Sequence, residues 1–348
     1  MKLPKVAERI LVVDLAMIGD LLCATPSLSA IRAAYPDSKI SVLASQTSAP
    51  ALAGNPNVNE VIGIDKKSAF RLPFRIFQTA AALRKRKFEI AFLLHNSIGS
   101  AIVAWMAGIK HRVGYATEGR GNLLTIRVAL PKERQHLIEQ RLSLLRKSGL
   151  DAPLQMPAYF VDSSRVSESL SRLLPSLDPG RPMVVLAVGS TWPTKIWPRK
   201  NVQAFLNKLP VGSVCIILVG APGEESLAEG LNSISVPVYN LVGKTTIEEL
   251  GHVISRADAV IAPDSGPMHI AEGLGKPTIG LFGPTDPKIC GMVHSAGVHI
   301  QPHMSCLCCW EKKCKNRTFC MAEISPDSVI DALFRAIGNT APAEKEVC

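Results

Sequence analysis

Short apolar strands alternate with amphipathic helices along almost the whole chain, and this alternation constrains the fold more than any other feature. Apolar runs of strand length predict buried strands at residues 10–14, 39–44, 58–64, 89–94, 183–188, 214–219, 238–241, 259–262 and 278–282. Between them, apolar residues recur at helical spacing. Strands that alternate with helices form parallel sheets that helices cover. The fold class is therefore α/β, with two Rossmann-like series.

The domain boundary is expected where the pattern breaks, near the Pro- and Gly-rich stretch Ser176–Pro182. A chain of 348 residues is too long for one ordinary core, which also favours two domains. We predict an N-terminal Rossmann-like domain at residues 1–177, a C-terminal one at 178–325, and a helix and tail at 326–348. The basic stretch 115–127 is expected to be a surface loop, and the tail from Gly338 onward to be disordered.

Charge and hydropathy limit the partners and the compartment. The net charge of +10 favours an acidic partner, but aromatic residues make up only 5% of the chain, which argues against a nucleic-acid partner. No apolar run reaches the roughly 20 residues that a spanning helix needs. Asp14 and Asp20 interrupt the apolar N-terminal region, which argues against a signal peptide. We therefore expect a cytoplasmic protein whose nine cysteines are reduced.

The stretch Asp264–Pro287 has the pattern of a strand–turn–helix phosphate site. Asp264 and Ser265 are good N-cap residues, and Gly266 with the following proline suits a first helical turn. Free backbone N–H groups and the positive end of the helix dipole favour a phosphate there, and His269 adds a donor. An ordinary strand–helix turn explains the local pattern equally well.

Two further positions lie where parallel sheets bind ligands. Asp20 follows the first strand, where a carboxylate can act as a general base or cap the next helix, and the spacing alone favours the cap. The loop from Gly189 to Lys195 follows the first strand of the second series. Its hydroxyls and lysine can hold a diphosphate, although a solvated lysine fits as well. Neither a Walker A loop nor a G-x-G-x-x-G motif is present, which disfavours dinucleotide oxidoreductases.

Five cysteines crowd into fifteen residues near the C-terminus. Cys306, Cys309, Cys314 and Cys320 form one C-x2-C pair followed by two single thiols, a spacing that can close a tetrahedral zinc or iron site. Thiols packed under a loop, or disulfides in an oxidising compartment, are the alternatives.

Together, these landmarks resemble the ADP-heptose:lipopolysaccharide heptosyltransferases of glycosyltransferase family 9. The matching pieces are Ile18-Gly-Asp-Leu-Leu22, Arg112-Val-Gly-Tyr115, Gly189-Ser-Thr191 with Lys195-Ile-Trp-Pro198, Asp264-Ser-Gly-Pro-Met-His269, Phe282-Gly-Pro-Thr-Asp-Pro287 and Cys320-Met-Ala-Glu-Ile324. They follow one another in order over nearly the whole chain.

The resemblance implies a GT-B glycosyltransferase fold, in which two Rossmann-like domains face a cleft. It also implies that the last helix packs back on the first domain. It assigns Asp20 as the catalytic base, against the helix cap that spacing favours. It implies a donor pocket made of Ser190, Thr191, Lys195, Asp264, Ser265, Gly266 and His269. Because diphosphate is a good leaving group, one base suffices for inverting transfer and no divalent metal is required.

The resemblance implies ADP-heptose as donor and the Kdo or heptose of the lipopolysaccharide inner core as acceptor, either Kdo-lipid A or heptosylated core. A basic protein could then bind peripherally to the cytoplasmic face of the inner membrane. The alternatives are a family member with another nucleotide sugar or a different acceptor, and a non-catalytic nucleotide-binding protein.

Overall fold

The computed structural model describes residues 2–65, 73–174, 177–178, 180–293, 296–316 and 319–338. The chain divides into a first unit, residues 1–160, and a second unit, residues 161–348. The prediction of a disordered tail from Gly338 onward concerns residues that, after Gly338 itself, lie outside the described part.

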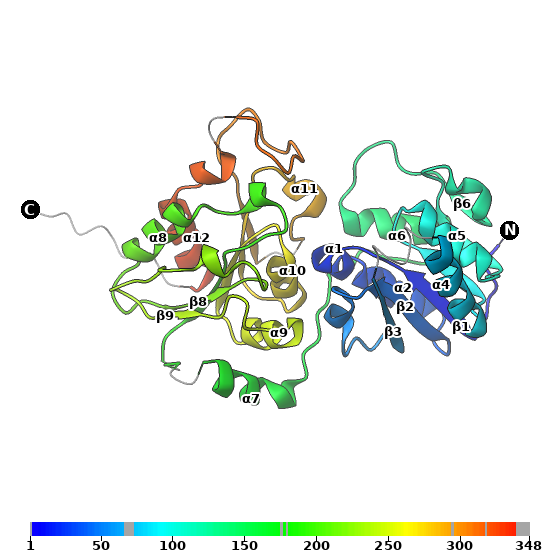
Figure 1. Ribbon diagram of the computed structural model, residues 1–348, viewed down its shortest axis with the longest axis horizontal. Coiled ribbons are helices and arrows are strands. Elements are labelled where there is room, and N and C mark those ends of the chain that lie inside the picture. Colours follow the sequence, from blue (N-terminus) through cyan, green and yellow to red (C-terminus); the bar gives the residue numbers. More distant parts are fainter. Residues whose placement is uncertain are drawn as a thin grey trace, which may run out of the picture. The chain divides into compact units, whose positions relative to one another are not determined.

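The first unit is a parallel α/β sheet (Figure 1). Its elements are β1 (Arg9–Val13), α1 (Ile18–Leu22), α2 (Thr25–Ala34), β2 (Lys39–Ser45), η1 (Ala49–Leu52), β3 (Glu60–Ile64), α4 (Pro73–Lys85), β4 (Ile90–Leu93), α5 (Ile98–Met106), β5 (His111–Tyr115), η2 (Arg120–Leu123), β6 (Ile126–Val128) and α6 (Leu137–Lys147). The strand order is β3-β2-β1-β4-β5-β6, and every neighbouring pair is parallel. The sequence prediction of a parallel Rossmann-like sheet is confirmed here.

Strand β1 shows why this sheet is buried on both faces. Ile10 and Val12 pack into the core that α2 and α6 cover. Leu11 and Val13 alternate with them and pack into the second core, under α4 and α5. Each such side chain gains roughly 1.5–3 kcal/mol on full burial. A continuous apolar strand is therefore the pattern of a sheet that is covered on both sides.

The second unit repeats this architecture. Its elements are α7 (Ser163–Leu173), β7 (Met183–Ala187), η3 (Pro193–Lys195), α8 (Arg199–Lys208), β8 (Cys215–Val219), η4 (Glu225–Leu227), β9 (Val238–Asn240), α9 (Ile247–Ser255), β10 (Ala259–Pro263), α10 (Gly266–Gly273), β11 (Thr278–Leu281), α11 (Pro287–Cys290), β12 (Gly297–Ile300), η5 (Cys320–Glu323) and α12 (Pro326–Ala336). The order β12-β11-β10-β7-β8-β9 is that of the first sheet, with β7 in the place of β1.

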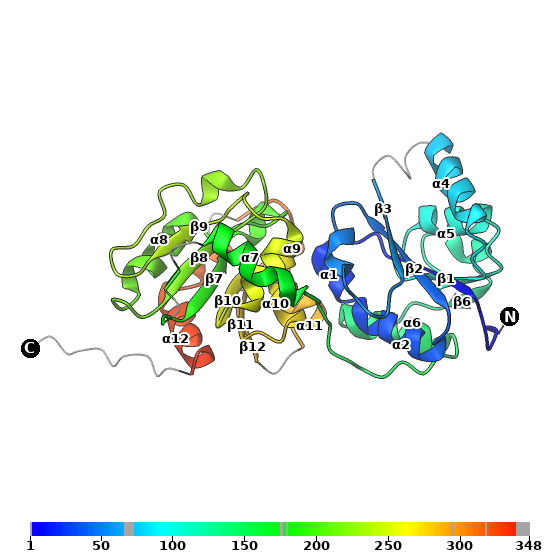
Figure 2. The same ribbon diagram turned by 90° about the horizontal axis from the view of Figure 1, so that it is seen from below.

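The last helix, α12, belongs to the core of the second unit. It packs on α8 (Figure 2), and its Val329, Leu333 and Phe334 are buried in the same core as strands β7 and β8. The resemblance predicted packing on the first domain. In the structure, the apolar face of this amphipathic helix is buried within the second unit.

The division of the chain lies after residue 160, earlier than the boundary predicted after residue 177. The reason is α7, which packs on α9 of the second unit. Arg165 and Arg172 form ion pairs with two glutamates of α9, and Ser169 Oγ lies 2.8 Å from the Nδ1 atom of His252. These partners are distant in sequence, so the Pro- and Gly-rich stretch after α7 is a connection inside the second unit.

The prediction of a surface loop at residues 115–127 is wrong at Arg120, whose side chain is fully buried. Its guanidinium donates to the backbone oxygens of Tyr115 (2.8 Å) and His95 (2.7 Å) and to Asn96 Oδ1 (2.9 Å). Because these acceptors satisfy the fork of donors, an arginine can be buried without a carboxylate partner.

Candidate active site

Asp20 lies in the first turn of α1, beyond the carboxyl end of β1. The N-cap residue of this helix is Met17, so capping does not explain Asp20. The Asp20 residue is half-buried, and within the described residues its carboxylate makes no hydrogen bond or ion pair. A carboxylate without a partner keeps its capacity to accept a proton. The base role of Asp20 stays a prediction that this geometry favours.

A buried ion pair, which sequence reasoning missed, lies close to Asp20. Arg141 of α6 donates from Nε and Nη2 to Asp14 Oδ2, at 3.1 and 2.9 Å. Burial opposes the charge of Arg141, but Asp14 and, to a smaller extent, Asp20 raise the pKa of its guanidinium. Arg141 is thus a fixed cation whose field reaches Asp20.

In the second unit, Lys195 and Asp264 form the centre of the candidate donor site. Lys195 Nζ lies 2.7 Å from Asp264 Oδ2 and 3.3 Å from the Asp264 backbone oxygen. The same Nζ lies 4.6 Å from the centre of the Trp192 ring. Burial alone would raise the pKa of Asp264, but the hydrogen bond from His269 and the charge of Lys195 lower it far below its usual range. Asp264 is therefore an anion. The sequence favoured Asp264 as an N-cap residue, but its carboxylate does not cap α10 in the structure.

His269 lies inside the unit, and its side chain is only 3% exposed. Its Nε2 atom is 3.6 Å from Asp264 Oδ1, and its Nδ1 atom is 3.5 Å from Glu272 Oε2. Cys290 Sγ also lies 3.3 Å from Asp264 Oδ2. Sequence reasoning missed Glu272 and Cys290. The signal for Glu272 was its place three residues after His269 on one helix, which puts both side chains on the same face.

The remaining predicted donor residues lie around this pair. Ser265 Oγ donates to the backbone oxygen of Pro263 (3.1 Å), and Gly266 opens α10. Ser190 and Thr191 follow β7, and Thr191 is exposed. Strands β7 and β10 are neighbours in the sheet. Six of the seven predicted residues lie in the segments that follow these two strands, up to the end of η3 and the first residue of α10. His269 is the exception, because it is one turn further along α10.

Glu224 is another residue near this edge that the sequence did not single out. Its Oε2 atom accepts a hydrogen bond from Ala221 N (2.7 Å). A Cβ atom on Gly189 would lie 1.8 Å from the same oxygen. Gly189 therefore allows a carboxylate from the loop after β8 to approach the end of β7.

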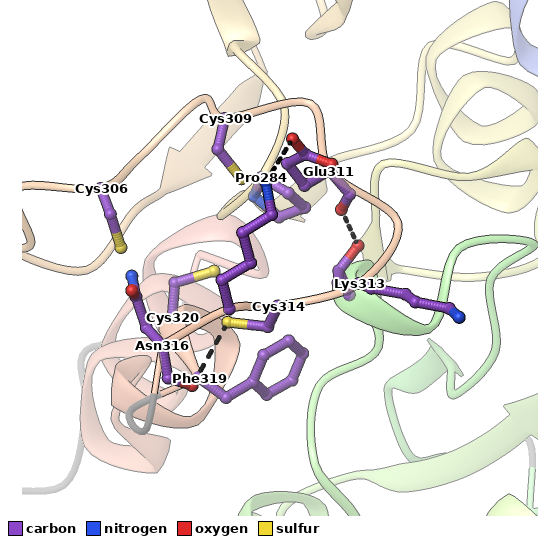
Figure 3. Close-up of a pocket in the computed structure, with 11 residues that line it drawn as sticks. Pro284, Cys306, Cys309, Glu311, Lys313, Cys314, Asn316, Phe319 and Cys320 are labelled. Carbon is purple, nitrogen blue, oxygen red and sulfur yellow. Dashed lines mark hydrogen bonds and ion pairs between the residues drawn. The ribbon is translucent and has the colours of Figure 1, made fainter.

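The four cysteines of the predicted metal site line one pocket of about 260 Å³ (Figure 3). Cys306, Cys309, Cys314 and Cys320 are all free thiols. Within the described residues, no three Cys, His, Asp or Glu side chains are grouped closely enough to hold a metal ion. Burial raises the pKa of the Cys320 thiol to about 11. As placed here, these cysteines are neighbours around a cavity and not a closed ligand set.

Residues 301–316, which carry four of the five clustered cysteines and are called the cysteine loop below, form a hydrogen bond with the loop that carries Lys195. Thr194 Oγ1 donates to the backbone oxygen of Glu311 at 2.7 Å. Lys312 Nζ lies 5.3 Å from the centre of the Trp192 ring, which Lys195 also approaches. The position of the cysteine loop and that of Lys195 are thus linked through adjacent residues.

Comparison with known proteins shows which family has this combination of fold and motifs. A family model for glycosyltransferase family 9 (heptosyltransferase) matches residues 76–319. The chain belongs to this family. It is a glycosyltransferase, as the resemblance indicated.

Individual members of the family cover most of the chain. Lipopolysaccharide heptosyltransferase 2 of Escherichia coli K12 is 30% identical over 294 residues, which are 80% of this chain and 84% of that protein. Lipopolysaccharide heptosyltransferase 1 of Pseudomonas aeruginosa is 27% identical over 333 residues, 88% of this chain and 87% of its own length.

Solved structures of the family share the fold. The structure of E. coli ADP-heptose LPS heptosyltransferase II has a TM-score of 0.79 and 25% identity, and the match covers 94% of this chain and 98% of that one. A family 9 glycosyl transferase from Veillonella parvula has a TM-score of 0.82 at 20% identity, with 95% and 97% covered. The GT-B prediction is confirmed. No helix among the described residues is both long and apolar enough to cross a membrane.

Proposed function

We propose that this glycosyltransferase moves L-glycero-D-manno-heptose from ADP-heptose to the Kdo or heptose of the lipopolysaccharide inner core, with inversion at the anomeric carbon. The observation that carries the proposal is the match of 80% of the chain to lipopolysaccharide heptosyltransferase 2 of E. coli at 30% identity. The half-buried carboxylate of Asp20 and the Lys195 side chain in the donor site of the second unit supply the groups that this reaction needs.

Asp20 is the proposed general base. It takes the proton of the acceptor hydroxyl as that oxygen bonds to the anomeric carbon of heptose. The bond between this carbon and the β-phosphate oxygen breaks, and its electron pair leaves with ADP. Because attack and departure occur on opposite faces, the configuration inverts. One carboxylate is enough, since diphosphate needs no protonation to leave.

The second unit is proposed to stabilise the leaving ADP. Lys195 is a partly buried cation beside Asp264, and the first backbone N–H groups of α10 have no partner within the helix. Ser190, Thr191, Ser265 and Gly266 would supply hydrogen bonds. These groups act electrostatically on the charge that grows on the diphosphate, so no divalent metal is required.

The acceptor proposal includes a place in the cell. The lipid A anchor of the proposed acceptor lies in a membrane. We therefore propose that the enzyme works at the cytoplasmic face of the inner membrane and binds there peripherally. The net charge of +10 supports attraction to an anionic surface.

We also propose that the cysteine pocket takes one structural zinc or iron ion, held by Cys306, Cys309, Cys314 and Cys320. The support is that four free thiols line a cavity of about 260 Å³. An ion would draw the sulfurs together and order the loop next to Thr194. Elemental analysis of anaerobically purified protein tests this. We expect about one equivalent, retained in Cys308→Ser and lost in Cys309→Ser/Cys314→Ser. Under a tenth of an equivalent, with all thiols titratable, would refute it.

Product mass tests the proposed function. The protein is incubated with ADP-heptose and deep-truncated core acceptors that end in Kdo or in heptose, with UDP-glucose and GDP-mannose as alternative donors. We expect a gain of one heptose on one acceptor and none with the other donors. Transfer of another sugar would favour a different nucleotide sugar. ADP binding without transfer to any acceptor would favour a different acceptor or a non-catalytic protein.

A further inference from the structure

Glu272 is an ionisable group that the proposed reaction does not use. Its side chain is fully buried on α10, one turn after His269. Oε1 accepts a hydrogen bond from Val293 N at 2.6 Å. Oε2 receives no hydrogen bond, and it lies 3.5 Å from His269 Nδ1. A buried carboxylate is costly unless a positive group compensates it.

The imidazole of His269 lies between two carboxylates. Nδ1 approaches Glu272, and Nε2 approaches Asp264 Oδ1 at 3.6 Å. A neutral histidine carries a proton on only one ring nitrogen, so its other nitrogen would present a lone pair to a carboxylate. A protonated ring presents a donor to each. The arrangement therefore favours the imidazolium.

The charges of the whole cluster agree with this protonation state. With their ordinary formal charges, Lys195, Asp264 and Glu272 together carry one net negative charge, and a charged His269 brings the cluster to neutrality. The Cys290 thiol, from α11, faces the Lys195 side of Asp264 at 3.3 Å. From α9, which packs on α10, the buried ionisable residue is His252, whose Nδ1 atom faces Ser169 Oγ at 2.8 Å. Next to Val293, whose N–H group donates to Glu272, the N–H group of Met292 donates to His299 Nε2 (3.0 Å).

The charge on His269 matters to Lys195 because both cations share Asp264. Asp264 Oδ2 faces Lys195 and Oδ1 faces His269. If His269 were neutral, Lys195 would be the only full cation to compensate a buried carboxylate, and less of its field would remain for a phosphate. His269 is almost unexposed, so its influence on a ligand would pass through Asp264.

We propose that Glu272 is a positioning residue that holds His269 as a cation, so that Asp264 is shared between two cations and Lys195 remains available to a nucleoside diphosphate. This inference rests on the proposed function, since it concerns the same donor site. It adds a residue outside the predicted pocket, and it changes the role of His269 from ligand to support for Asp264.

The charge of His269 can be measured without any substrate. Nitrogen-15 NMR of histidine-labelled protein, with the signal assigned by a His269→Gln variant, reports the protonation of each ring nitrogen. We expect both nitrogens to be protonated at about pH 8, well above the ordinary histidine pKa of about 6.5. A neutral ring at this pH would overturn the inference. This measurement uses the wild-type protein, so it does not depend on the folding of a Glu272 variant.

The effect on the donor site is tested by ADP calorimetry as a function of pH. The ratio of the ADP Kd of Glu272→Gln to that of wild type cancels the titration of ADP itself. We expect this ratio to rise from about one near pH 6 to about ten near pH 8.5, as His269 loses its proton only in the variant. Glu248→Gln, at an exposed glutamate of α9, should give a ratio near one throughout.

The outcomes separate the two proposals. A ratio that does not depend on pH would contradict the role of Glu272 even if ADP binds and heptose is transferred. Absence of ADP binding in wild type would contradict the proposed function, while the NMR result would still decide whether Glu272 keeps His269 charged.

Discussion

The two sheets have the same strand order but differ in whether every carboxylate near their carboxyl ends faces a basic side chain. In the first unit, Asp14 is paired with Arg141, and the Asp20 carboxylate makes no hydrogen bond or ion pair with the residues that the structure describes. In the second unit, each buried carboxylate of the donor site faces a basic side chain: Asp264 faces Lys195 and His269, and Glu272 faces His269.

This difference shows how one topology can serve two tasks. A general base must have a carboxylate that can still accept a proton from the acceptor. A site for a diphosphate needs cations that are held in place before the ligand arrives. The strand order supplies the same sheet edge in both units, and a few side chains decide which task each edge performs.

The largest effect is expected from Asp20. Asp20→Asn removes the proposed base but keeps its size, and turnover should fall by about 10²–10⁴-fold. The rate of ADP release in the presence of acceptor measures this. Asp37→Asn, at an exposed position of the same unit, should leave the rate unchanged. Wild-type turnover in Asp20→Asn would contradict the proposal that the first unit supplies the general base.

Loss of Arg141 should act on stability. Arg141→Leu leaves Asp14 buried without its cation and should cost about 3–5 kcal/mol of unfolding free energy. Arg165→Leu, which breaks an exposed ion pair in the second unit, should cost less than about 1 kcal/mol. Urea unfolding followed by circular dichroism compares the two variants. Equal costs would show that the buried Asp14–Arg141 pair contributes no more to the unfolding free energy than an exposed ion pair does.

Lys195→Ala should weaken the donor site in both ground and transition states. We expect ADP affinity to fall by roughly tenfold and kcat/KM to fall by at least as much, because the lysine meets charge that grows during the reaction. The matched control is Lys208→Ala, whose side chain pairs with Asp327 on the surface of the same unit. Unchanged ADP affinity by calorimetry would exclude Lys195 from the donor site.

A smaller effect is expected where the cysteine loop meets the Lys195 loop. Thr194→Val removes the hydrogen bond to Glu311 and should weaken ADP binding by a few-fold, as one lost hydrogen bond of about 1 kcal/mol implies. Thr194→Ser keeps the hydroxyl and should bind ADP as wild type does. If both variants match wild type, the cysteine loop does not influence the donor site.

No effect is expected from chelation of free divalent cations. Transfer in excess EDTA should proceed at the untreated rate, because Lys195 and backbone N–H groups are proposed to compensate the leaving diphosphate. A strict requirement for added Mg²⁺ or Mn²⁺ would show that the donor site of the second unit is incomplete without a metal ion.

Much of the fold could be predicted from the sequence because local patterns determine it. The continuous apolar strand Ile10–Val13 indicated a sheet that is covered on both faces, and the structure confirms it. Pro26 suits only the first turn of a helix, and α2 begins at Thr25 with this proline in its first turn. Gly275, with a φ of 68°, follows α10 as expected from its freedom to adopt a left-handed conformation.

The features that were missed depend on partners far away in the sequence. The pair Asp14–Arg141 joins residues that only the fold brings together, while Lys195 and Asp264 were placed in one pocket by the resemblance and not by their spacing. Without the fold, a buried arginine is indistinguishable from a solvated one, as the error at Arg120 shows. The same limit explains α7, whose partners on α9 are about eighty residues away.

The central claim is that the first unit supplies the base while the second unit alone holds the nucleotide. Calorimetric titration of ADP into Asp20→Asn, with Lys195→Ala measured alongside, tests it most directly. We predict that Asp20→Asn binds ADP within about twofold of wild type, while Lys195→Ala binds it roughly tenfold more weakly. A tenfold loss in Asp20→Asn as well would contradict this division.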